Sequence, residues 1–333
     1  MTDTMRAVVT TGHGDIEIQD VPVPHAKANE VIIEPVGTGI CGTDLHLVRG
    51  DYVIGNYPLI LGHEMAGYIT EVGAEVTNFS VGDYVGANPN VTCGECTWCK
   101  QNATNLCEHI SPADIMQDGS CAEFIAMPAK FVYNLCTEIP HHVAPLTEPL
   151  SCVLHALDLA PDWKDQDMVI FGAGSIGLVA LVVALDEGAA SVSVVEPNPA
   201  RAQAVKLGAV QAADSAADLD RDSYHLTLDA SGNAGAIADA IRILGKRGRL
   251  IQMGVPSPDA TIDFRPLDLF EKEISLIGAQ SLANMYPAAA ERMAHLYDKL
   301  DGLVTGTFPV DRYEEALEAM KSPEHIKIFI TDK

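Results

Sequence analysis

A glycine-rich turn between two apolar segments places the strongest constraint on the fold of this chain of 333 residues. Residues 168–171 are apolar, the run G-A-G-S-I-G occupies 172–177, and an uncharged, mostly apolar segment continues to Leu185. This order indicates a short buried strand, a tight turn and a buried helix. Strand-like runs then alternate with helix-like stretches, which predicts a doubly wound parallel sheet from about residue 150. The strand-like runs lie at 191–195, 226–229, 249–253 and 274–277, and a helix-like stretch lies at 234–244.

The glycine spacing in this turn is that of a dinucleotide-binding loop. Gly172 permits the tight turn, Gly174 lets the backbone approach a pyrophosphate, and Gly177 lets the helix pack closely on the strand. The amide groups at the start of the helix, at Ser175 and Ile176, would face the phosphates. The spacing alone is weak, and glycine packing without any ligand is the alternative. The preceding strand and the following helix favour the dinucleotide.

An acidic residue at the end of the next strand-like run indicates which dinucleotide is bound. Glu196 follows residues 191–195, at about the distance from Gly172 expected for the carboxylate that binds the adenosine ribose. A carboxylate there accepts hydrogen bonds from the 2′- and 3′-hydroxyls and repels a 2′-phosphate. We therefore predict NAD rather than NADP, although Arg201 lies nearby and could accommodate a phosphate.

The first part of the chain has a different character. Up to about residue 140 it carries short runs rich in Val and Ile that are separated by Gly and Pro. This pattern predicts an all-β module ahead of the parallel sheet. The whole chain is therefore expected to be an α/β protein with a β domain and a nucleotide-binding domain.

Four of the eight cysteines are concentrated in one loop. Cys93, Cys96, Cys99 and Cys107 have the spacing C-x2-C-x2-C-x7-C. Four thiolates suit tetrahedral zinc and leave no position open for a substrate, so we predict a structural zinc site. An iron–sulfur cluster also takes four cysteines and is the rival interpretation. A redox dithiol would need only two.

A second set of metal-binding residue types is spread along the chain. It comprises Cys41, the pair His63 and Glu64, and Glu148. One thiolate, one imidazole and one or two carboxylates would leave room for water or substrate, as in a catalytic zinc site. From spacing alone this set is weak, because such residues are more often found in the core or at the surface.

These motifs together resemble the zinc-dependent medium-chain dehydrogenases of the alcohol and polyol type. The resemblance is carried by Cys41-Gly42-Thr43-Asp44, by Gly62-His63-Glu64-Met65-Ala66-Gly67, by the four-cysteine loop and by 172–177, and it covers essentially the whole chain. It implies a GroES-like catalytic domain at 1–150 with both zinc sites. It further implies a Rossmann NAD-binding domain at 151–280 and a segment at 281–333 that returns to the first domain.

The resemblance also implies roles for single residues. Cys41 and His63 would bind the catalytic zinc with Glu148, and Glu64 would be either a ligand or a residue just behind the metal. Thr43 would accept the alcohol proton and His46 would pass it to solvent, although His46 could also be an ordinary surface histidine. Asp44 would orient the site. The implied reaction moves a hydride between NAD(H) and a secondary alcohol.

The Glu148-Pro149-Leu150-Ser151 run resembles sorbitol dehydrogenase and its relatives, which favours a sugar alcohol or another polyol. Polyol-specific members carry Arg-Tyr where this chain has Ser281-Leu282, and Tyr where it has Leu47. Simple secondary alcohols and diols are therefore also candidates. A zinc-stabilised NAD(H)-binding protein without turnover is a further alternative, which the presence of Cys41, His63 and Glu148 disfavours.

Composition limits the partners and the compartment. Asp and Glu number 46 against 21 Lys and Arg, a net charge of −25, which argues against nucleic acid or an anionic membrane. The stretch 168–185 could be mistaken for a membrane span, but glycines interrupt it. No signal peptide is visible, so we predict a cytoplasmic protein with reduced cysteines. By resemblance it would be a homo-oligomer, a dimer or tetramer.

Overall fold

The computed structural model describes residues 4–50, 56–198 and 204–332, and the chain divides into two compact units. The first unit comprises Met1–Ser151 together with Ala283–Lys333, and the second comprises Cys152–Leu282. The C-terminal segment thus belongs to the same unit as the N-terminal half. Arg201 lies outside the described residues.

A seven-stranded sheet forms the centre of the first unit. Its strands run in the order β10-β6-β5-β3-β18-β17, and β9 also pairs with β3. Strands β3 and β5 are the longest of the seven, and they pair antiparallel over most of their length. The bounds are β3 Glu30–Gly39, β5 Glu64–Val72, β6 Tyr84–Ala87, β9 Ile125–Pro128, β10 Val132–Asn134, β17 Val304–Phe308 and β18 Lys327–Ile330.

Smaller elements complete this unit, and the predicted all-β character of the first part of the chain is confirmed. A three-stranded sheet has the order β2-β1-β4, and β7 pairs with β8. The strands are β1 Thr4–Thr10, β2 Glu17–Pro22, β4 Leu59–Ile60, β7 Asn90–Val91 and β8 Ser111–Pro112. The helices are α1 Gly42–Arg49, α2 Thr97–Lys100, α7 Tyr286–Leu300 and α8 Tyr313–Ala319, and α3 Thr147–Asp158 contains the boundary at Ser151.

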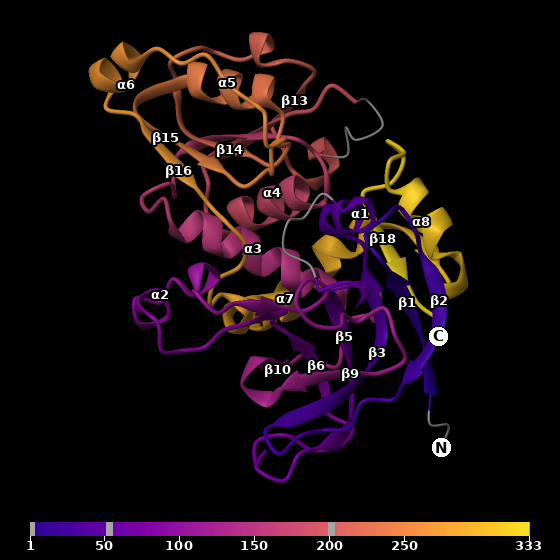
Figure 1. The fold of residues 1–333 in the computed structure, drawn as a ribbon. Helices are drawn as coiled ribbons and strands as arrows, with labels where there is room; N and C mark the ends of the chain where they lie inside the picture. The colour runs from indigo at the N-terminus through magenta and orange to yellow at the C-terminus, as the bar shows by residue number, and fades with distance from the viewer. Residues whose placement is uncertain (1–3, 51–55, 199–203, 333) are drawn as a thin grey trace. The chain divides into compact units, whose positions relative to one another are not determined.

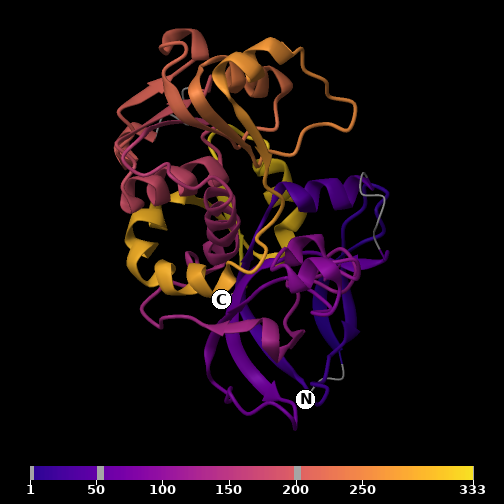
Figure 2. The ribbon, with the colours of Figure 1, turned by 90° about the vertical axis from the view of Figure 1, so that its left-hand side faces the viewer.

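The C-terminal segment is part of the first unit's core. β18 pairs antiparallel with β3 and parallel with β17, so the last strand lies inside the sheet. Tyr313, Leu317 and Ile328 are buried in one apolar cluster with Val8 of β1 and Leu61. In both views the yellow C-terminal segment accordingly lies against the indigo and violet strands (Figures 1 and 2). The first unit therefore cannot bury its core without residues from both ends of the chain.

The second unit contains the predicted doubly wound parallel sheet. Its six strands run in the order β13-β12-β11-β14-β15-β16, and each neighbouring pair is parallel. Helix α4 lies on one side of this sheet and α5 on the other (Figure 1). The strands are β11 Asp167–Phe171, β12 Ser191–Val195, β13 Gln211–Ala213, β14 Tyr224–Asp229, β15 Leu244–Gln252 and β16 Ser275–Gly278. The helices are α4 Ser175–Glu187, α5 Ala234–Arg242 and α6 Pro266–Lys272.

The apolar stretch at 168–185 forms β11, a glycine-rich turn and most of α4, as predicted. Residues 178–184 of α4 are all buried, which explains why the helix has no polar face. Across the described part of the chain, no helix has the length and apolar character needed to span a bilayer.

Candidate metal and cofactor sites

The four cysteines of the predicted structural site converge in the structure. The sulfur atoms of Cys93, Cys96, Cys99 and Cys107 all lie within 4.8 Å of one another, and none of the four forms a disulfide. Sγ of Cys93 lies 3.5 Å from that of Cys107 and 3.9 Å from that of Cys99. Four soft donors at this separation fit a tetrahedral zinc ion.

Backbone amides support the negative charge that such a site requires. The amides of Glu95 and Cys96 each donate to Cys93 Sγ at 3.4 Å. Amide hydrogen bonds lower the pKa of Cys93 and lower that of Cys96 to about 6, whereas desolvation raises the pKa of Cys99 to about 12. The amides thus favour thiolates at Cys93 and Cys96, and a bound cation would favour a thiolate at Cys99 as well.

The second predicted constellation is brought together in part. Donor atoms of Cys41, His63 and Glu64 lie within 4.8 Å of one another. Cys41 is the N-cap of α1, His63 immediately precedes β5, and Glu64 is its first residue. Gly39 on the neighbouring strand makes room for Glu64, because a Cβ there would lie 2.1 Å from Glu64 Oε2. A sulfur, a nitrogen and an oxygen donor therefore converge where β3 ends and where α1 and β5 begin.

Glu148 does not belong to this group of converging donors. It lies in the first turn of α3, and its side chain is buried. Its negative charge contributes to raising the pKa of Lys327 and of Tyr286. Glu148 is thus close enough to the first unit's buried charges to influence them.

A buried lysine pairs with Glu64. Lys327, the first residue of β18, donates to Glu64 Oε1 at 2.6 Å and to Oε2 at 2.7 Å, and also to the backbone oxygen of Ile40 at 3.0 Å. Both side chains are at least 95% buried. Burial lowers the pKa of Lys327, but the charges of Glu64, Cys41 and Glu148 and the hydrogen bonds to Glu64 together raise it, so the net shift is upward. Both Glu64 oxygens are therefore engaged by a cation from the C-terminal segment.

Two buried aspartates hold the other two donors. Asp44 Oδ2 accepts a hydrogen bond from the Cys41 amide at 2.8 Å, which closes a capping box at the start of α1. Asp114 Oδ2 lies 2.6 Å from His63 Nδ1. Burial raises the pKa of Asp44 to about 6. Burial lowers the pKa of His63, but Asp114 raises it, and the net shift is upward. Each of the three donors thus has a charged partner of its own.

Thr43 and His46 both lie on α1 next to this group. They are three residues apart, which places them on neighbouring turns of one helix face, and both side chains are half-buried. Thr43 Oγ1 lies 3.8 Å from Cys41 Sγ. The hydroxyl predicted to handle the alcohol proton is therefore beside the sulfur predicted to bind the metal.

The glycine-rich turn of the second unit has the geometry of a dinucleotide loop. Gly172 has φ 99°, a left-handed conformation that other residues adopt at a cost. A Cβ at Gly177 would lie 1.9 Å from the Gly172 oxygen, whereas one at Gly174 would meet nothing within 4 Å. Ser175 and Ile176, both half-buried, begin α4, and its N-cap Gly174 makes no side-chain cap. The first amides of α4 therefore remain available to an anion.

Glu196 is directed toward this turn. Its Oε2 accepts a hydrogen bond from the Ala173 amide at 2.9 Å, and its Oε1 accepts one from the Asn198 amide at 3.0 Å. A carboxylate has about four lone-pair sites, so these two bonds leave capacity for ribose hydroxyls.

A neighbouring loop that the sequence analysis missed borders the same turn. Asp229, fully buried at the end of β14, accepts hydrogen bonds from the Ser231 amide at 3.0 Å and the Gly232 amide at 3.1 Å. A Cβ at Gly172 would contact Ser231. The carboxyl ends of β11 and β14 thus meet, which is where doubly wound sheets bind ligands.

Leu47 and Leu282, two positions at which this chain differs from polyol-specific members of the family, are buried. Leu47 is 0% exposed and packs with Val8, Ile40 and Leu61. Leu282 is also 0% exposed. Leu47 thus packs in the core of the first unit, and the expectation drawn from Leu47 and from Ser281-Leu282 about the substrate stays a prediction.

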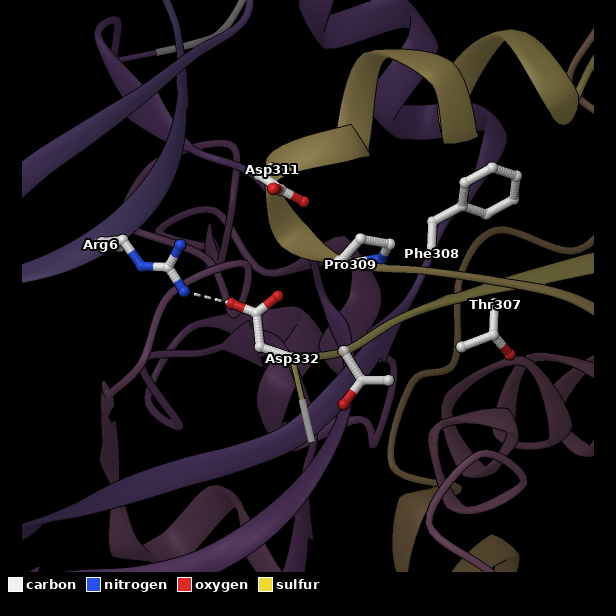
Figure 3. A pocket seen from close by; sticks show the side chains of 7 residues that line it. Arg6, Thr307, Phe308, Pro309, Asp311 and Asp332 are labelled. Carbon is white, nitrogen blue, oxygen red and sulfur yellow. Dashed lines mark hydrogen bonds and ion pairs between the residues drawn. The ribbon is translucent and has the colours of Figure 1, made fainter.

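Two surface cavities among the described residues of the first unit are not lined by the candidate residues. One of about 560 Å³ is lined by Arg6, Thr307, Phe308, Pro309, Asp311, Thr331 and Asp332. Figure 3 shows that Arg6, its one lining cation, pairs with Asp332 at 2.5 Å, while Asp311 is a further acid of the lining. A second, of about 520 Å³, lies between β1, β2, β4 and β9 and has a largely uncharged lining.

Comparisons with known proteins agree with this geometry. The model for the alcohol dehydrogenase GroES-like domain matches residues 27–137, and the model for the glucose dehydrogenase C-terminus matches residues 141–331. D-arabitol-phosphate dehydrogenase of Enterococcus avium is 31% identical over 99% of this chain and 98% of its own length. Sorbitol dehydrogenase of Bacillus subtilis is 32% identical over 94% of this chain and 93% of its own. The chain belongs to the zinc-dependent medium-chain alcohol and polyol dehydrogenase family.

Solved structures support the same assignment for this dehydrogenase. The 2R,3R-butanediol dehydrogenase of Bacillus subtilis superimposes with a TM-score of 0.90 at 25% identity, and the match covers 99% of this chain and 100% of that one. The predicted family, and the fold of a GroES-like domain with a Rossmann sheet, are confirmed. The prediction of a dehydrogenase rather than a protein without turnover is also confirmed at the level of the family.

The Glu64–Lys327 pair of this dehydrogenase gives a direct test of its buried electrostatics. Lys327→Met would leave the Glu64 carboxylate buried without a cation, which costs about 3–5 kcal/mol of the free energy of unfolding. The double variant Glu64→Gln/Lys327→Met should recover most of that loss, because neither charge remains. Urea unfolding of the wild type, both single variants and the double variant measures the coupling. Additive effects of the two single substitutions would contradict the pairing.

Proposed function

We propose that this protein oxidises a secondary alcohol group of a sugar alcohol or other polyol to a ketone, with NAD as the hydride acceptor, and that it also runs in reverse. The observation that carries the proposal is the convergence of Cys41, His63 and Glu64 within 4.8 Å in a chain of this family. The relatives most similar in sequence include enzymes named for arabitol phosphate, altritol and sorbitol. Their names support a polyol but do not single one out.

We assign Cys41 and His63 as residues that would hold a catalytic zinc ion, and Glu148, which is buried in the first turn of α3, as the third ligand that the resemblance implies. Glu64 is assigned to the position behind it, since Lys327 engages both of its oxygens. Bound there, zinc supplies Lewis-acid polarisation of an alcohol oxygen, which lowers the pKa of the hydroxyl. Thr43 Oγ1 would accept the hydroxyl proton, and His46 on the next turn would release it to solvent.

The four-cysteine loop would hold a second, structural zinc ion. Its four sulfurs leave no donor position for a substrate. The loop would thus stabilise the first unit rather than take part in the reaction. The first unit would be the catalytic domain with both zinc sites, and the second the NAD-binding domain.

NAD would bind at the glycine-rich turn of the second unit. Gly172, Gly174 and Gly177 would admit the pyrophosphate beside the amides of Ser175 and Ile176. Glu196 would accept hydrogen bonds from the ribose hydroxyls and disfavour a 2′-phosphate, whereas Arg201 lies outside the described residues. We also propose a cytoplasmic location, supported by the four-cysteine loop, in which Cys93, Cys96, Cys99 and Cys107 form no disulfide.

The metal and substrate assignments are tested together by Cys41→Ser. The wild type should contain two zinc ions per chain and reduce NAD with a polyol. The variant should lose one ion and more than about 100-fold of its activity, since even an outer hydrogen-bond partner of a metal site is worth 10–100-fold. Zinc analysis and an NADH assay with sorbitol, arabitol, arabitol phosphate and 2,3-butanediol, each with NAD and with NADP, provide the measurement.

Cys136→Ser is the matched control, because this half-buried cysteine lies outside both metal groups. It should keep both zinc ions and full activity. A wild type that binds both ions but reduces neither cofactor with any of these alcohols would contradict the proposed reaction. Turnover with butanediol alone would move the substrate class to simple diols.

The cofactor assignment predicts that Gly174 and Gly302 differ in their effect on NAD binding, although a Cβ at either position would meet nothing within 4 Å. Gly174→Ala places a methyl group in open space, so the fold should tolerate it, but the methyl would occupy room needed by the pyrophosphate. We expect NAD affinity to fall about 10-fold to 100-fold, since such overpacking costs about 1–3 kcal/mol. Gly302→Ala in the first unit, where a Cβ also meets nothing, is the control. Calorimetric titration that shows equal affinities for the wild type and Gly174→Ala would exclude this cofactor loop.

We further propose a homo-oligomer in which β16 pairs with β16 of a second copy. β16 is the edge strand of its sheet, and an edge strand can pair with itself across a two-fold axis. Leu276 on β16 is 45% exposed, and Phe270 on α6 beside it is 81% exposed. Together with the unpaired strand edge, these exposed apolar side chains would suit an interface between two copies.

Light scattering during size-exclusion chromatography measures this association. The wild type should run as a multiple of 35.5 kDa, and Leu276→Lys should shift it to a smaller assembly. Val81→Lys, at an apolar side chain that is 65% exposed on the first unit, should leave the mass unchanged. A wild type at the monomer mass would rule out the pairing.

A further inference from the structure

We propose that Asp114 is the positioning residue that orients His63 for metal binding, an inference that rests on the proposed role of Cys41 and His63 as zinc ligands. Asp114 lies outside every motif that identifies the family, and the sequence analysis assigned orientation of the site to Asp44. The structure separates these two carboxylates by what each one contacts.

The contact between Asp114 and His63 is short and buried. Asp114 Oδ2 lies 2.6 Å from His63 Nδ1, with side-chain exposures of 1% and 10%. A carboxylate at this distance favours a proton on Nδ1. The other ring nitrogen, Nε2, then carries the lone pair that a metal ion requires, and the ring cannot rotate without breaking the bond.

Asp44 has a different partner. Its Oδ2 accepts from the Cys41 amide at 2.8 Å, so it positions the sulfur ligand through the start of α1. Asp44 lies within 4.8 Å of both His63 and Asp114, which places two buried carboxylates beside one imidazole. The two carboxylates therefore position different ligands, because Asp44 holds the backbone of Cys41 and Asp114 holds the ring of His63.

The loop that carries Asp114 is built to hold this carboxylate in place. Asp114 has φ 62°, a left-handed conformation that is rare for residues other than glycine but accessible to aspartate. Around it, the Ala113 amide donates to the Pro89 oxygen at 2.9 Å, and Gln117 Nε2 donates to the Ser111 oxygen at 2.7 Å. On the other side the Asn56 amide donates to the Ile115 oxygen at 3.1 Å, so hydrogen bonds hold the backbone before and after Asp114 while its side chain contacts His63.

Asp114→Asn tests this role because it keeps the size of the side chain but removes its charge. The neutral amide holds the Nδ1 proton less strongly, so zinc affinity at the Cys41–His63 site should fall about 10-fold to 100-fold. Occupancy of the four-cysteine site should not change. Competition with a chromophoric chelator measures zinc affinity, and the absorption bands of the cobalt-substituted protein report the ligand geometry.

Two further variants make the result specific. Asp118→Asn changes an exposed carboxylate of the same loop and should leave affinity and cobalt bands at wild-type values. Asp114→Glu keeps the charge and should recover part of the zinc affinity that Asp114→Asn loses. Asparagine, like aspartate, adopts the left-handed backbone conformation readily, so Asp114→Asn should fold.

Wild-type zinc affinity and cobalt bands in Asp114→Asn would overturn the proposal, as would an unchanged zinc content in Cys41→Ser. A second outcome separates the two proposals. If the wild type binds zinc at Cys41 but oxidises no alcohol, and Asp114→Asn weakens that zinc binding, the role of Asp114 is supported and the proposed reaction is contradicted. The two failures are therefore distinguishable.

Discussion

The buried ion pair between Glu64 and Lys327 is the interaction on which the first unit depends. Glu64 begins β5 and Lys327 begins β18, so the pair joins two strands that are 263 residues apart in the chain. Lys327 also bonds to the Ile40 oxygen, immediately before Cys41. Burying these charges is tolerable only because each finds its partner with short, direct hydrogen bonds. The C-terminal segment must therefore return to the first unit before the donor group can be complete.

The two candidate metal groups differ in a way that follows from their donors. The four-cysteine loop is local, closed and supported by its own backbone amides. The donors of the Cys41–His63–Glu64 group come from two segments of the chain. Asp44 holds the backbone of Cys41, whereas Asp114 and Lys327, which hold His63 and Glu64, are distant in sequence. Such separate supports suit a site that must keep its geometry while one position stays open for substrate. Under the proposed function, one group would stabilise the fold and the other would perform the chemistry.

Local patterns in the sequence predicted the parallel sheet well. Strand β12 has the predicted bounds, Ser191–Val195, because a run of small and β-branched residues there is buried on both faces. Strand β15 begins at Leu244, earlier than the predicted 249, because exposed Lys246 and Arg247 resemble a turn and Arg247 has φ 57°. The hydrogen-bonded strand therefore extends beyond its apolar run, so the apolar pattern alone gives a strand that is too short.

Long-range partners could not be found in the same way. Asp114 and Lys327 carry no local signal, since their importance comes from His63 and Glu64, which are distant in sequence. The burial of Leu47 is a further example, because its position beside His46 does not reveal which face of α1 turns toward the core. Motif spacing therefore identifies the donors, whereas the three-dimensional structure is needed to identify what holds them.

Anomalous diffraction at the zinc edge from crystals grown with the metal tests the central claim most directly. The account predicts two peaks for each chain. One should lie among the four sulfurs of the cysteine loop, and the other within about 2.0–2.3 Å of Cys41 Sγ and His63 Nε2. A single peak in the cysteine loop, with no density at Cys41 in zinc-replete crystals, would contradict the account.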